Sequence, residues 1–189
     1  MKRAFLIVFF LGWFVSSTAH AIVIGPIAGS WDGTEDTQTN RLFRDGVAST
    51  CAAPKAFPGT FTSGTQLYET FSFLNAGPED CVTIDVTVSS ADTHFSVYLG
   101  SYDPTNLALN YLGDIGSSES QAFSVVVPGF SQFVVVANTN FGGDSALGQT
   151  FSFTVEGDSV TTSVPEPTSL ILFGIALAGL GLSRRRIAS

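Results

Sequence analysis

Few side chains in this 189-residue chain are suited to chemistry. The sequence has two histidines, and only His94 lies away from the ends of the chain. A lone imidazole cannot build a histidine-rich zinc site. It could serve a Ser-His-Asp triad, which needs one histidine, but no G-x-S-x-G or comparable nucleophile motif accompanies it. We therefore expect no catalytic residues and no enzyme activity.

Two further observations support that expectation. His94 alternates with Phe95 and Val97, which predicts an imidazole that faces solvent, opposite the apolar side chains. The chain contains no G-x-G-x-x-G, P-loop or C-x-x-C motif, so we expect no cofactor. Paired carboxylates of a glycoside hydrolase stay open as an alternative, because acidic residues are plentiful.

The segment "WDGTEDTQTN" is the best candidate for binding a metal or a ligand. It places Asp32, Glu35 and Asp36 just after Trp31. Oxygen-rich loops suit calcium, but this one does not match the D-x-D-x-D-G pattern of a known calcium loop. A solvated acidic loop is the favoured interpretation, and calcium the alternative. Trp31 could stack on a sugar, although a single aromatic residue more often belongs to a core.

The N-terminus has the layout of a secretory signal peptide. Lys2 and Arg3 precede an apolar run of 12 residues, 4–15, and a small-x-small pattern ends at Ala21. The apolar run is short for a membrane anchor, although an uncleaved anchor is the alternative. We predict a signal-peptide helix over 1–21, export by the secretion machinery, and a mature chain that begins at Ile22.

The C-terminus combines three features. Pro165, Glu166 and Pro167 keep the backbone extended and out of helix geometry. Residues 168–182 are almost entirely apolar and would span about 22 Å as a helix, which is short for a bilayer core unless flanking residues reach its interfaces. A basic cluster, Arg184, Arg185 and Arg186, can reach an interface and would stay on the cytoplasmic side. We predict a transmembrane helix over 168–182.

The order of these features resembles the PEP-CTERM sorting signal of Gram-negative bacteria, over residues 164–186. The resemblance implies recognition of the Pro165–Pro167 tripeptide by a membrane enzyme, exosortase, and removal of the tail. It also implies a final place at the cell surface or in the extracellular matrix, with an association with exopolysaccharide and biofilm. An ordinary single-pass tail anchor is the alternative.

Charge limits the partners of the segment between the two ends. Ile22 to Val164 contains three basic and fifteen acidic residues, a net charge of −12, against −8 for the whole chain. Binding of nucleic acid needs clustered Lys and Arg, so nucleic acid is excluded as a partner. Extracellular polysaccharide is expected as a partner because the resemblance of the tail implies it, and the alternative function is a carbohydrate- or calcium-binding module.

This central segment is expected to be all-β. Apolar and polar residues alternate with a period of two in six segments: 67–74, 82–88, 95–99, 123–127, 133–137 and 151–155. Turn-forming residues separate them, which predicts a single β-sandwich over 22–160 with its twelve phenylalanines in the core, followed by a sorting tail over 161–189. The stretches "YLGSYDPTN", "NYLGDIGSS" and "FSFTVEG" resemble an exported bacterial β-sandwich family akin to small jelly-roll modules.

Two cysteines, Cys51 and Cys81, lie in this segment. In an exported chain an even number of cysteines predicts a disulfide. The 30-residue separation, with no histidine close in sequence to both, disfavours a metal or redox pair. We predict a Cys51–Cys81 disulfide.

Overall fold

A computed structural model describes residues 21–162. The expected signal peptide up to residue 20, the Pro165–Pro167 tripeptide, the expected helix over 168–182 and the arginines 184–186 lie outside the described residues. Within 21–162, no helix has the length and apolar character to cross a membrane.

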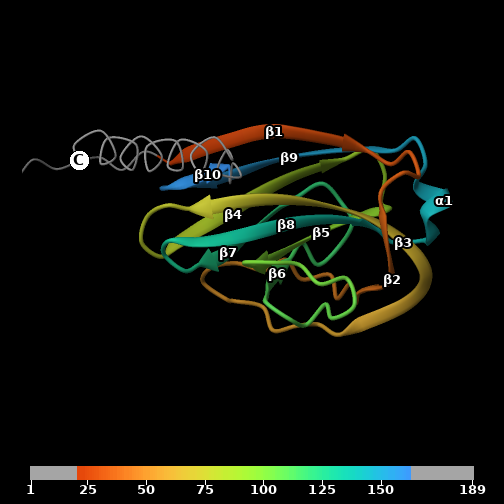
Figure 1. Cartoon of the computed structure of the whole chain (residues 1–189), viewed down its shortest axis with the longest axis horizontal. Helices are drawn as coiled ribbons and strands as arrows, with labels where there is room; N and C mark the ends of the chain where they lie inside the picture. The colour runs from red at the N-terminus through yellow and green to blue at the C-terminus, as the bar shows by residue number, and fades with distance from the viewer. Residues whose placement is uncertain (1–20, 163–189) are drawn as a thin grey trace, which may run out of the picture.

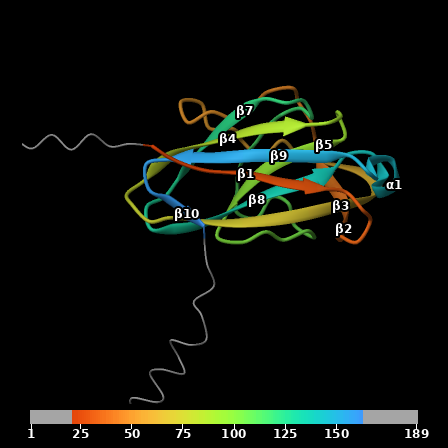
Figure 2. The same ribbon diagram turned by 90° about the horizontal axis from the view of Figure 1, so that it is seen from above.

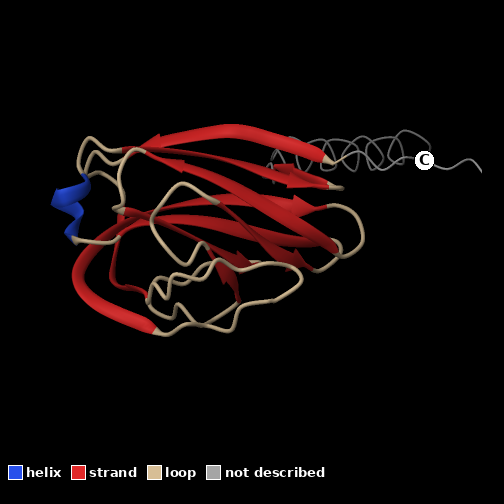
Figure 3. Cartoon of the chain, turned by 180° about the vertical axis from the view of Figure 1, so that it is seen from behind, coloured by secondary structure: helices blue, strands red, loops and turns tan. Residues whose placement is uncertain are grey.

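The described residues form ten strands and one short helix in two facing sheets (Figures 1 and 3). The smaller sheet has the order β1-β9-β4-β7, and the larger has the order β10-β3-β8-β5-β6 with β2 also paired to β3. The smaller sheet contains β1 (Ile22–Ser30), β4 (Asp80–Val88), β7 (Ala122–Val127) and β9 (Thr150–Gly157). The larger contains β2 (Asp36–Leu42), β3 (Thr60–Asn75), β5 (Thr93–Leu99), β6 (Tyr111–Asp114), β8 (Ser131–Thr139) and β10 (Val160–Thr162). The helix, α1, covers Gly142–Ala146.

This strand order is that of a jelly roll. Every paired neighbour is antiparallel, and eight of the strands form two four-stranded sheets by the double Greek-key connection. The two other strands both extend the edge at β3, whose length lets β2 pair with its first half and β10 with its second half. In Figures 1 and 2, β10 lies beside β3 at the opposite end of the sandwich from α1. The predicted all-β sandwich is therefore confirmed.

All six predicted strand segments are strands, and in β4, β7 and β9 the alternation in the sequence corresponds to alternation in burial, whereas β5 and β8 are buried almost throughout. In β4, Val82, Ile84 and Val86 are buried while Asp85 between them is exposed. The strands that the sequence did not reveal lack this pattern. β2 reads DTQTNRL and contains a single aliphatic residue, and β1 changes phase at a bulge between Ile24 and Ile27. β10 ends at Thr162, two residues beyond the expected domain boundary at 160.

The expectation that all twelve phenylalanines form the core was wrong. Four lie in loops or at a strand end and are exposed: Phe43, Phe61, Phe130 and Phe141. A fifth, Phe57, is half-buried and packs on Tyr111 outside the core. Seven form the layer between the sheets: Phe71, Phe73, Phe95, Phe123, Phe133, Phe151 and Phe153. Their rings meet mostly edge to face; Phe153, for example, lies 5.0 Å from Phe71 and 5.5 Å from Phe95 between ring centroids.

The loop between β2 and β3 closes one side of the sandwich. Ser49 bonds through its backbone to Asp114 of β6 and to Ser124 of β7, so this loop bridges the edges of the two sheets. The disulfide then ties the loop to β4: Cys51 and Cys81 are bonded, with their Cα atoms 5.9 Å apart. The predicted disulfide is confirmed, and it holds a loop whose residues cover the larger sheet.

Removing this disulfide should destabilise the domain. Closing a loop across 30 residues contributes about 3 to 4 kcal/mol in the chain-entropy model. We expect the Cys51→Ala/Cys81→Ala variant to lose that much free energy of unfolding in urea titrations. The single variant Cys51→Ala should lose as much, because one cysteine cannot form the bond. Unchanged stability of both variants would contradict a structural role for the disulfide.

Candidate functional site

Trp31 is not a surface residue, so the suggestion that it stacks on a sugar was wrong. Its side chain is fully buried. The indole Nε1 donates a hydrogen bond of 2.9 Å to Thr93 Oγ1, and the ring packs against Phe151 with centroids 5.2 Å apart. The residue follows directly on β1, and the end of that edge strand turns it inward to close the core.

The acidic segment after Trp31 is a self-contained turn. The carboxylate of Glu35 accepts hydrogen bonds from the backbone N–H groups of Asp32 (2.8 Å) and Gly33 (2.9 Å). The carboxylate of Asp32 accepts from the backbone and hydroxyl of Thr34, and these bonds lower the pKa of Asp32. Asp36 begins β2. Within residues 21–162 no three acidic, histidine or cysteine side chains are grouped to hold a metal ion.

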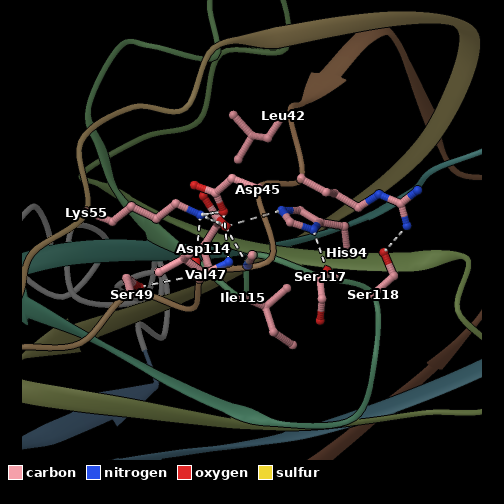
Figure 4. A network of polar contacts seen from close by, with 12 residues as sticks. Leu42, Asp45, Val47, Ser49, Lys55, His94, Asp114, Ile115, Ser117 and Ser118 are labelled. Carbon is pink, nitrogen blue, oxygen red and sulfur yellow. Dashed lines mark hydrogen bonds and ion pairs between the residues drawn. The ribbon is translucent and has the colours of Figure 1, made fainter.

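The most concentrated polar site is a buried network around Asp114, at the end of β6 (Figure 4). Lys55 Nζ lies 2.7 Å from Asp114 Oδ1 and 2.6 Å from Asp45 Oδ1, and it also donates to the carbonyl of Val47 at 2.7 Å. Asp114 further accepts hydrogen bonds from the Tyr111 hydroxyl and from the backbone N–H of Gly116. Both side chains of the central ion pair, Lys55 and Asp114, are buried.

His94, on β5, lies against this network and is buried, so the expectation that it faces solvent was wrong. Its phase was predicted correctly, because it points away from the core side of the sheet. That outer face is covered by the β2–β3 loop and by the segment after β6. The cover is tight: Gly116 has a φ of 73°, and a Cβ there would come within 2.3 Å of the Val47 backbone.

The imidazole of His94 is neutral at pH 7. Burial lowers its pKa to about 4, an effect that outweighs the opposing influence of Asp114. Nδ1 lies 2.8 Å from the carbonyl of Ser117, which can only accept, so Nδ1 carries the proton. Nε2 is buried without a hydrogen-bond partner, 3.9 Å from Asp114 Oδ1. The histidine and the carboxylate therefore lie close together, and both side chains are buried.

The three basic residues of the described chain are all engaged. Lys55 is held by the two carboxylates already described. Arg41 is buried, donates to the carbonyls of Asn140 and Leu42, and lies 4.6 Å above the ring of Phe61. Arg44 donates to Ser118 and lies over Phe141. The charge that residues 21–162 present to a partner is consequently negative.

A second cluster, which the sequence analysis missed, gathers all four tyrosines of the chain: Tyr68, Tyr98, Tyr102 and Tyr111. They lie on the outer face of the larger sheet with the buried Val134 and Val136. The phase of alternation contained part of this signal, since Tyr98 follows the inward-facing Val97. The loop residue Tyr102 joins the cluster only through the folding of the segment after β5.

Comparison with known families identifies the tail. Residues 163–186 match the model described as the PEP-CTERM protein-sorting motif. The chain carries this sorting signal. No curated protein matches the chain.

The motif establishes that the protein is exported, that it passes through a membrane-anchored intermediate and that it is an exosortase substrate. The match contains the tripeptide Pro165-Glu166-Pro167 and the arginines 184–186, which carried the resemblance in the sequence. It begins at the residue after β10 ends, so the sorting tail follows the folded domain directly.

The buried His94 makes the stability of the domain depend on pH. Its folded pKa of about 4 lies below the ordinary 6.5, so the unfolded chain binds the proton first as the pH falls. The free energy of unfolding should decrease by about 3 kcal/mol between pH 6.5 and 4. Carboxylates with lowered pKa values, such as Asp45, contribute only below that window.

Urea unfolding at a series of pH values tests this expectation. His94→Asn keeps a donor near the Ser117 carbonyl but has no titratable group, so its stability should be nearly flat between pH 6.5 and 4. An equal slope in the variant would show that another group causes the pH dependence.

Proposed function

We propose that the protein is a non-enzymatic component of the extracellular polysaccharide matrix, or of the surface, of a Gram-negative bacterium. The observation that carries the proposal is the sorting motif at 163–186, placed directly after a folded, disulfide-bonded all-β domain. Processing by exosortase would release this domain from its membrane intermediate to the outside of the cell.

The state of the polar residues supports a non-enzymatic role. His94 is buried, and its Nδ1 proton is donated to the carbonyl of Ser117. The carboxylate of Asp114 accepts hydrogen bonds from Lys55, Tyr111 and Gly116. Removing a partner from such a buried charge pair is costly, which fits a structural function for the network. Catalysis would need a nucleophile and a base at the same open cleft, and the buried network around Asp114 does not combine them.

Binding of a carbohydrate by the domain itself is a second candidate, favoured over binding of calcium. The carboxylates of Asp32 and Glu35 are occupied by neighbouring backbone and hydroxyl groups. The exposed edge of the tyrosine cluster, in contrast, offers aromatic rings beside open polar side chains.

Association with the matrix can be measured in the producing cells. We expect the exported protein to fractionate with the extracellular polysaccharide and to be released when periodate opens the sugar rings by cleaving their vicinal diols. Lysozyme-treated cells without polysaccharide removal provide the control for release of cell-wall proteins. A protein that stays in the soluble medium fraction, with or without periodate, would contradict the proposed matrix role.

The tripeptide should be needed for processing and not for membrane insertion. Replacing Pro165-Glu166-Pro167 by three alanines removes the two prolines that we expect to keep this segment extended, while leaving the apolar run and the arginines unchanged. Intact mass of the native protein should show a chain that begins at Ile22 and has lost 184–186. The triple variant should keep those arginines and remain in the membrane fraction.

The double variant Ile187→Ala/Ser189→Ala is a matched control, since it changes the tail beyond the arginines and should be processed normally. Normal processing of the triple-alanine variant would show that the tripeptide is incidental.

A further inference from the structure

We infer that the groove beside the packed rings of Tyr68 and Tyr102 binds a neutral polysaccharide chain. The inference rests on the proposed matrix function and identifies the surface and the ligand chemistry through which the domain would act. We call this surface the tyrosine groove; it is lined by Asp36, Tyr68, Thr70, Ser72, Gly100, Ser101, Tyr102, Gln132 and Val134 and has a volume of about 320 Å³.

The floor and walls of the groove are built by the larger sheet. Tyr68, Thr70 and Ser72 alternate along one face of β3, and Ser72 pairs with Val134 of β8, whose side chain is buried. Tyr102 comes from the loop after β5, and its ring centroid lies 5.2 Å from that of Tyr68. The groove therefore has the packed, half-buried rings of Tyr68 and Tyr102 along one side and the buried Val134 among its lining residues.

Tyr102 is held in place from two sides. Its ring packs on Tyr98 of β5, with centroids 4.8 Å apart, and its hydroxyl donates to the side chain of the buried Gln38 of β2. Burial raises the pKa of Tyr102, so this hydroxyl stays neutral. A wall that is already ordered before binding reduces the entropy that association costs.

Unused polar groups line the rim. Thr70, Ser72 and Gln132 are exposed, and within residues 21–162 no hydrogen bond engages their side chains. Binding sites combine apolar walls with a few convergent polar groups that fix orientation. A sugar ring matches this combination, because its C–H faces can pack on tyrosine while its hydroxyls bond to hydroxyl and amide groups.

Charge selects among the polysaccharides. Asp36 lies in the groove, and all three cations of the described domain are engaged elsewhere. A uronate or sulfated chain would meet a carboxylate and an anionic surface, with no free Arg or Lys to pair with. The chemistry of the groove therefore fits an uncharged glycan.

Affinity electrophoresis of the exported protein tests this inference with defined polymers. Native gels would contain dextran, mannan or a soluble β-glucan as neutral probes, and alginate as the anionic probe. At least one neutral polymer should retard the wild-type protein. Tyr68→Ala should weaken binding about tenfold, as expected for the loss of a central aromatic contact. Gln132→Ala changes only an exposed side chain and should weaken it severalfold.

Phe43→Ala is the matched control, since it also removes an exposed aromatic ring but lies beyond the far end of β2 from Asp36. It should bind as the wild type does. Thermal melting of each variant would separate loss of binding from loss of fold.

The following outcomes would overturn the inference. Each can be told apart from failure of the proposed matrix function. Equal retardation of the wild type, Tyr68→Ala and Gln132→Ala would place binding elsewhere on the domain. Retardation by alginate alone would overturn the ligand chemistry. If no polymer retards the wild type while the protein still fractionates with its native matrix, the groove is wrong and the matrix role stands. If the protein neither binds any polymer nor fractionates with its native matrix, both the groove and the proposed matrix function are overturned.

Discussion

The layer of phenylalanine rings between the two sheets supports every other feature of the domain. Phe151 and Phe153 of β9 lie in the smaller sheet and meet Phe71 and Phe95 of the larger one. Each buried ring contributes a few kcal/mol through removal of apolar surface from water. Because this layer fixes the spacing and phase of the strands, it also fixes which residues face outward.

The outward face of the larger sheet is used in two different ways. Over β5 and β6, the β2–β3 loop and the segment after β6 cover this face and enclose Lys55, Asp114 and His94. A buried ion pair contributes little net stability by itself, but it requires the loop to stay in position once its partners are desolvated. The disulfide from Cys51 to β4 holds the same loop covalently. At another part, around Tyr68, the face is left open and polar.

The anionic surface and the sorting tail fit one cellular route. A domain with no available cation resists binding to anionic lipid and nucleic acid once it is outside the cell. The sorting motif begins directly after β10, whose first residue, Val160, is buried in the core. The last strand described therefore ends at the residue before the processing signal starts.

The sequence by itself determined the sorting tail, the disulfide and six of the ten strands, because each depends on local order: a tripeptide before an apolar run, a cysteine count, or a period of two. β2 and β10 could not be found in this way, since their pairing with the long β3 strand supplies what their sequences lack. Alternation also placed His94 on the outer face, but only tertiary structure decided that loops would bury it. The same holds for Trp31, which the end of β1 turns into the core, and for Tyr102, which a loop brings to Tyr68. Periodicity reports the side of a strand on which a residue lies, whereas exposure and neighbours depend on segments far away in the chain.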